Sequence, residues 1–160
     1  MDLTTFYAVV SATCFTLTGL WWGAVDKHPD WKARPVRRRQ AGGIYLSFLL
    51  PALMSLFAQV NPDNPLLWRF SFGAAALLGA FSSLSLLRQE RGDAVVGPFR
   101  RARWAVILLY ALVIVLAVAP ELAGFTGLKP LQCAAIVLIL LIVLGHGLTW
   151  EFLMEEPEDA

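Results

Sequence analysis

The sequence predicts an all-α integral membrane protein: a bundle of five transmembrane helices, with the amino terminus outside and the carboxyl terminus in the cytoplasm. Of the 160 residues, 58% are hydrophobic and only 16% are charged. Soluble domains contain about 45–50% apolar residues. The charged residues are confined to a few segments, which leaves five long uncharged runs. Each run is close to the roughly 17–25 residues that cross a hydrocarbon core of about 30 Å.

The first predicted helix covers residues 3–25 and begins almost at the amino terminus. A cleaved signal peptide is the alternative for such a segment, but signal peptides carry basic residues before an apolar core of about 7–15 residues. Here the acidic Asp2 precedes the run, and the run is longer. We therefore expect this segment to remain in the protein as a transmembrane helix.

The second and third predicted helices cover residues 42–60 and 66–87. Pro51 interrupts the second run, but neighbouring helices can satisfy the backbone group that a proline frees, so it predicts a kink rather than an end. The connecting sequence NPDNP, residues 61–65, disfavours helix continuation and favours tight turns. We expect the two helices to form an antiparallel hairpin.

The fourth and fifth predicted helices cover residues 104–120 and 130–150. Their sequences are mostly apolar, with Tyr110 the one polar side chain of the fourth run. Helices that are apolar on all sides are typical of positions that face lipid. We therefore place these two helices at the periphery of a single membrane domain, residues 1–160, which ends in an acidic cytoplasmic tail at residues 151–160.

Basic residues predict the orientation. Eleven of the thirteen lysines and arginines lie in two segments, residues 26–40 and 88–103, which five alternating helices place on the same side. The positive-inside rule assigns that side to the cytoplasm. We expect a multi-pass protein of the bacterial inner membrane that binds anionic lipid headgroups rather than nucleic acid. The arginines expected to contact those headgroups are Arg37, Arg38, Arg39, Arg100, Arg101 and Arg103.

Tryptophans mark the predicted helix ends. An indole ring keeps its apolar body in lipid and its N–H among the headgroups. We expect five of the six to be such anchors and the sixth, Trp21, to face the bundle. The six are Trp21, Trp22, Trp31, Trp68, Trp104 and Trp150.

The first helix carries two stripes at helical spacing. The polar stripe is Thr4, Tyr7, Ser11, Cys14, Thr18 and Trp21. The small-residue stripe is Ala8, Ala12, Thr16, Gly19 and Gly23. Small residues let helices approach closely, so we expect the small-residue stripe to contact another helix and the polar stripe to line a pathway. Alternatively, the hydroxyls of the polar stripe bond to carbonyls of their own helix or to a neighbouring helix.

The third predicted helix has similar features. Ala75, Gly79 and Ser83 form a ridge of small residues, and Ser82 and Ser85 add hydroxyls toward the cytoplasmic end. We expect the first and third helices to line the interior of the monomer or of an oligomer.

Motifs for catalysis or metal binding were sought and not found. The sequence has no CxxC, HExxH, P-loop or GxSxG pattern, and Cys14 and Cys133 are each isolated inside a predicted helix. We expect no enzyme, cofactor or metal. His146, between two glycines and five residues before Glu151, is a candidate titratable switch, since an ionisable residue inside a membrane helix usually has a function. The alternative is a position at the membrane surface.

These patterns favour a small homo-oligomeric channel or permease for a small ion or solute, with the first helix lining the pathway. The alternative is a non-transporting subunit, sensor or scaffold whose polar stripe packs against a partner protein.

Overall fold

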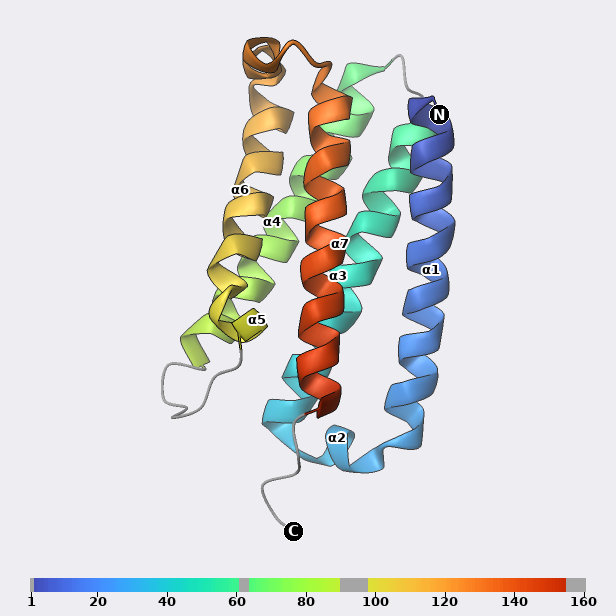
Figure 1. Cartoon of the computed structure of the whole chain (residues 1–160), viewed down its shortest axis with the longest axis vertical. Helices are drawn as coiled ribbons and strands as arrows, with labels where there is room; N and C mark the ends of the chain where they lie inside the picture. The colour runs from blue at the N-terminus through green and yellow to red at the C-terminus, as the bar shows by residue number, and fades with distance from the viewer. Residues whose placement is uncertain (1, 61–63, 90–97, 155–160) are drawn as a thin grey trace.

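The computed structural model describes residues 2–60, 64–89 and 98–154, and within these ranges all regular structure is helical. Five long helices form one bundle (Figure 1). The elements in chain order are α1 (Leu3–Lys27), α2 (Pro29–Ala33), α3 (Pro35–Val60), α4 (Pro65–Gln89), α5 (Pro98–Arg101), α6 (Arg103–Val118), the 3-10 helix η2 (Pro120–Thr126) and α7 (Pro130–Met154).

Prolines explain most of the helix starts. Six of the nine prolines are the first residue of a helix, where the missing N–H has no helical partner to lose. α1 instead begins after Asp2, whose side-chain Oδ1 accepts a 2.6 Å hydrogen bond from the Thr5 N–H. α3 begins at Pro35 rather than at residue 42 and continues through Pro51, as predicted. Of the predicted hairpin turn, residues 61–63 lie outside the described residues; α3 and α4 pack against each other on either side of it.

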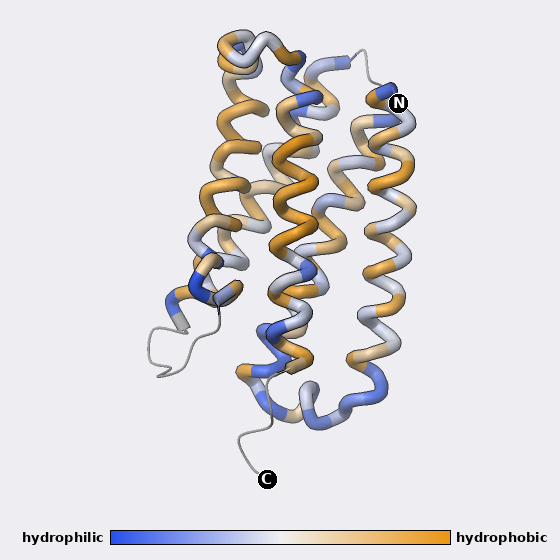
Figure 2. Tube along the Cα trace, in the orientation of Figure 1, coloured by the Kyte–Doolittle hydropathy of each residue, from blue (hydrophilic) through white to orange (hydrophobic). Residues whose placement is uncertain are grey.

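The two ends of the bundle differ in polarity. Apolar residues fill the middle of the long helices, and hydrophilic residues gather around α2 (Figure 2). We call the end that holds α2, the start of α3 and the end of α7 the basic end, and the opposite end, which holds η2, the η2 end (Figure 1). The acidic tail from residue 155 onward lies outside the described residues.

The fourth predicted helix, residues 104–120, ends two residues earlier than expected. α6 ends at Val118, and after a bend of 108° the chain continues as η2. Pro120 cannot continue the hydrogen-bond ladder of α6, and Gly127, with φ +71°, ends η2 in a left-handed conformation. Four helices are therefore long and apolar enough to cross a membrane, or five if α6 and η2 form one bent span.

The end of α6 is capped from α4. The Arg69 guanidinium donates through Nε to the carbonyl of Ala117 at 2.6 Å and through Nη2 to the carbonyl of Val118 at 2.7 Å. The last carbonyls of a helix have no partner within it and carry partial negative charge, so a cation there is stabilising. This contact between α4 and α6 was not predicted from the sequence.

The buried share of each long helix differs from the predicted arrangement of the bundle. In α3, 50% of the most apolar stretch is buried, and in α7 39%, against 22% in α1 and in α4. The first and third predicted helices, α1 and α4, were expected to line the interior, and the fifth, α7, to lie at the periphery. Because α7 is more buried than α1 and α4, the prediction is wrong for α7. Hydropathy does not separate a lipid-facing helix from a central one, since both surroundings are apolar. Small residues on α7, such as Ala134 and Ala135, are buried at its contacts.

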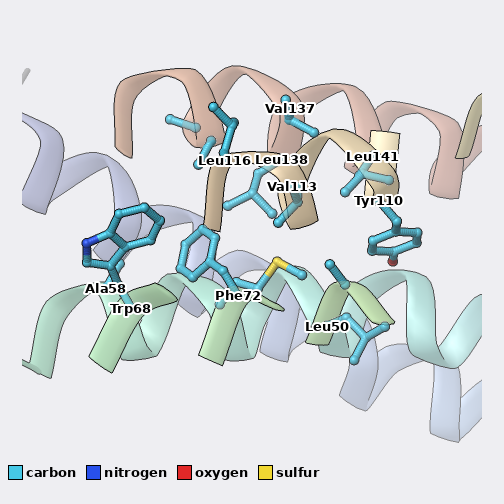
Figure 3. Packing of buried hydrophobic residues seen from close by; sticks show 14 of the residues in the cluster. Leu50, Ala58, Trp68, Phe72, Tyr110, Val113, Leu116, Val137, Leu138 and Leu141 are labelled. Atoms are coloured by element: carbon cyan, nitrogen blue, oxygen red, sulfur yellow. The ribbon is translucent and has the colours of Figure 1, made fainter. Parts of the chain in front are cut away.

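The main apolar cluster is formed mostly by α3, α4, α6 and α7 (Figure 3), and Tyr7 of α1 and Ala123 of η2 also belong to it. Trp68 is only 6% exposed and packs edge-on against Phe72, so it belongs to this cluster and is not a surface anchor. Tyr110 lies at the end of the cluster nearer the basic end (Figure 3).

Candidate functional site

The polar stripe of α1 faces the bundle, mainly against α3. Its members from Tyr7 to Trp21 are buried, whereas Thr4 is exposed. The Tyr7 hydroxyl donates a 2.7 Å hydrogen bond to the carbonyl of Leu131 on α7, and the Thr18 hydroxyl donates to the Cys14 carbonyl of its own helix at 2.8 Å. The five residues from Tyr7 to Trp21 therefore share one buried face, and Thr4 does not belong to it. Their contacts are those of the helix-packing alternative.

The small-residue stripe of α1 faces outward. Its five members are exposed, and a Cβ atom built on Gly19 or Gly23 would meet no atom within 4 Å. The prediction that this stripe contacts another helix of the chain is therefore wrong. Groups such as the Tyr7 hydroxyl and the Trp21 indole N–H need partners that lipid does not provide, which turns the polar stripe inward.

A wide groove lies instead between α3 and α4 at the basic end, with a volume of about 500 Å³. We call it the α3–α4 groove. Both hydroxyls predicted on the third helix, Ser82 and Ser85, line it, and Arg39 is exposed at its edge. The remaining lining residues are Gly42, Gly43, Tyr45, Leu46 and Leu86.

A smaller inner chamber of about 30 Å³ adjoins the groove, enough for about one or two water molecules. The groove and the chamber share Gly43, Leu46, Ser82 and Leu86, so they adjoin, and we call the two together the recess. The polar side chains around the chamber are Ser47, Ser82, Ser83, Arg103 and Tyr110.

Glycines set the shape of this recess. A Cβ on Gly43 would lie 2.6 Å from Cδ1 of Leu86, and a Cβ on Gly79 would overlap the ring of Tyr110. Leu86 and Tyr110 thus occupy space that the two glycines leave free. Leu86, which is 7% exposed, lies where the groove meets the chamber. The predicted close approach at the Gly79 ridge is confirmed, and its partner is α6.

The recess is closed toward the η2 end by the main apolar cluster. On α3, the hydroxyl of Ser55 is fully buried and has no hydrogen-bond partner among the described residues. Ser55 lies two helical turns from Ser47 on α3, with Pro51 between them. Because Pro51 has no N–H, the carbonyl of Ser47 lacks its usual helical donor. This face of α3 therefore continues the polar character of the chamber.

Arg103 does not lie on the lipid-facing surface, where headgroup contact was predicted. It is 6% exposed and lines the inner chamber. Among the other predicted headgroup contacts, Arg37 donates to the Phe152 carbonyl at 3.2 Å, while Arg38, Arg39 and Arg101 are exposed. The Arg100 side chain lies outside the described part of the structure.

His146 and Glu151 are not brought together. His146 is exposed on α7, where its Nδ1 lies 2.8 Å from the Ile142 carbonyl and its ring is edge-on to Phe48. Glu151 accepts a 2.7 Å hydrogen bond from the Phe99 N–H at the start of α5. Gly145 and Gly147, on either side of His146, make room for Ser47 and Phe99.

No protein family, curated protein or solved structure matches the chain. The recess between α3, α4 and α6 is therefore interpreted from its own chemistry. It combines cationic and hydroxyl groups with an opening at the basic end, which suits a small anionic or hydrogen-bonding solute.

Proposed function

We propose that the protein is a small membrane permease, assembled as a homo-oligomer, whose solute enters the bundle through the α3–α4 groove from the cytoplasm. The observation that carries this proposal is the recess formed by the groove and the inner chamber. Polar side chains inside a membrane bundle are costly without partners, and they mark solute pathways in many membrane proteins. This proposal moves the pathway from α1 to α3, α4 and α6.

The solute we propose is a small anion. Arg39 lies at the edge of the groove and Arg103 lines the chamber, while Ser47, Ser82 and Ser83 supply hydroxyls. Arginine and lysine side chains that line a pore select anions in other membrane proteins. The exposed small-residue stripe of α1 supports the oligomer, because such stripes let helices of neighbouring subunits approach closely.

Flux into proteoliposomes tests the function. Purified protein is expected to pass chloride or nitrate but not potassium. Leu86→Ala, which widens the junction of groove and chamber, is expected to raise the anion flux severalfold. Leu77→Ala is the matched control, because Leu77 lies on the same helix and is 60% exposed.

The apolar cluster that closes the recess favours one alternative, a non-transporting subunit that only binds its ligand there. Absence of flux for every ion tested, in protein that is folded and reconstituted, would support that alternative and reject the permease. An equal effect of Leu77→Ala and Leu86→Ala would show that the groove is not the entrance.

A further inference from the structure

A second groove lies on the other side of α3, between the last turns of α1, the short helix α2 and the first turns of α3. Its volume is about 360 Å³, within the range of about 300–1,000 Å³ typical of small-molecule sites. We call it the aromatic groove. The side chains that matter for its chemistry are Trp21, Trp22, Trp31, Tyr45, Lys32 and Arg38.

The inner wall of the aromatic groove is held in place by several contacts. The Trp21 indole N–H donates a 3.0 Å hydrogen bond to the Ala41 carbonyl, so its one polar atom is satisfied inside the bundle. Trp21 stacks on Trp31 at 5.9 Å between ring centroids, and both rings meet the edge of Phe152. The surface that these rings offer to the groove is therefore apolar and well ordered.

The outer wall is also aromatic but more open. Trp22 packs edge-on against Tyr45 at 5.6 Å and is 58% exposed. Tryptophan at a helix end is typical of the boundary between lipid chains and headgroups. The groove is therefore placed where a lipid molecule can enter it from the side.

The rim of the groove is cationic. Asp26 takes one of the three donors of the Lys32 ammonium in a 2.9 Å ion pair. The Arg38 guanidinium is exposed and has no partner among the described residues. Among the other charged groups of α2, Asp30 lies 3.9 Å from His28 and does not neutralise Arg38. A cationic ligand is thus disfavoured, although aromatic rings alone would bind one.

From these two features, an apolar aromatic wall and a cationic rim, we infer that the aromatic groove binds one anionic phospholipid. An acyl chain lies along the indole rings, and the headgroup phosphate is held by Arg38 and the free donors of Lys32. A soluble anion would use only the rim, and a zwitterionic lipid would gain less from it. The two grooves share Gly42 and Tyr45, but the tryptophans, Lys32 and Arg38 line only the aromatic groove. This inference therefore does not depend on the permease.

Lipid retention by the full-length protein in mild detergent tests the inference. Native mass spectrometry is expected to show one retained phosphatidylglycerol in preference to phosphatidylcholine. Arg38→Gln is expected to lower phosphatidylglycerol binding about fivefold, the equivalent of about 1 kcal/mol for one basic residue near anionic lipid. Trp22→Ala is expected to weaken both lipids, because it removes apolar wall rather than charge.

Matched controls lie at the same end of the bundle. Arg101 is exposed on α5 and Trp150 is 62% exposed on α7, and neither lines the aromatic groove. Arg101→Gln and Trp150→Ala are expected to leave the retained lipid unchanged. Neither Arg38 nor Trp22 is buried, so folding of the test variants is expected and is checked by thermal unfolding.

Several results would overturn the inference. Equal losses in the control and test variants would indicate diffuse attraction of headgroups to the basic end. Equal retention of phosphatidylcholine would remove the role of charge. Displacement of the lipid by glycerol phosphate alone would show that a soluble anion is the ligand, and a co-purified peptide in place of lipid would show that the groove is a protein interface.

Discussion

At the residue scale, the glycines of the bundle fall into two kinds that look alike in the sequence. Gly79 leaves space for the ring of Tyr110, and Gly147 leaves space for the ring of Phe99. Gly19, by contrast, has no neighbouring atom within 4 Å of the position of a Cβ. The spacing of small residues along a helix alone therefore does not reveal contact. The difference depends on whether a side chain of another helix lies opposite, as Leu86 does at Gly43.

Gly79→Ala is expected to destabilise the protein by about 1–3 kcal/mol, the usual cost of overpacking a filled core, because the added methyl group overlaps the Tyr110 ring. Gly73→Ala, on the same helix, is the control. It is expected to be neutral or to stabilise by up to about 1 kcal/mol, because a Cβ there would lie at an ordinary contact distance of 3.8 Å from Ala117 and alanine favours the helix. Thermal unfolding in detergent measures both. Similar melting temperatures for the two variants would contradict the packing of Tyr110 on Gly79.

Arg69→Met is expected to destabilise the bend between α6 and η2. The substitution removes two charge-assisted hydrogen bonds to the carbonyls of Ala117 and Val118, and such bonds contribute about 1.5–3 kcal/mol when well formed. Arg88→Met, at the exposed end of the same helix, is the control. Proteolysis within η2, followed by mass spectrometry, is expected to become faster in Arg69→Met alone, and unchanged protection would show that the cap is not needed.

At the element scale, the sequence was informative about which segments are helices and much less about how they are arranged. The uncharged runs located all five long helices, and the 3.6-residue period identified the shared face of Tyr7, Ser11 and Cys14. The same period could not show whether that face meets water, lipid or protein. In a membrane, lipid chains and neighbouring helices are both apolar, so the spacing of polar residues does not tell them apart. The α3–α4 groove could not be predicted from the sequence either. It depends on the contact between Gly43 on α3 and Leu86 on α4, which the sequence of neither helix alone reveals.

Thiol accessibility separates the two helix faces. In a Cys14→Ala, Cys133→Ala background, cysteine at Ser82 is expected to react with a small water-soluble reagent on the order of tenfold faster than cysteine at Ser11, since the reactive thiolate forms in water. Ser82 lines the groove and the chamber, whereas Ser11 is 5% exposed. Faster reaction at Ser11 would restore α1 as the pathway and reject the α3–α4 groove.

At the scale of the whole molecule, charge separates the two ends of the bundle. Of the thirteen basic residues, only Arg69 and Lys129 lie outside the two basic segments. Arg69 is used at the η2 end to hold the carbonyls of α6, so its charge has a local partner. The remaining asymmetry favours insertion with the basic end in the cytoplasm, the orientation on which the direction of solute entry in the proposed permease depends.

This orientation predicts which positions an impermeant reagent reaches in intact cells. In the same cysteine-free background, Gly124→Cys in η2 is expected to be labelled from outside, and Arg101→Cys in α5 only after permeabilisation. Both positions are exposed, and a Cβ on Gly124 meets no atom within 4 Å, so neither substitution disturbs packing. Labelling of Arg101→Cys alone in intact cells would reverse the orientation. Labelling of both would show that the charge asymmetry fails to fix it, because chains would then insert in both directions.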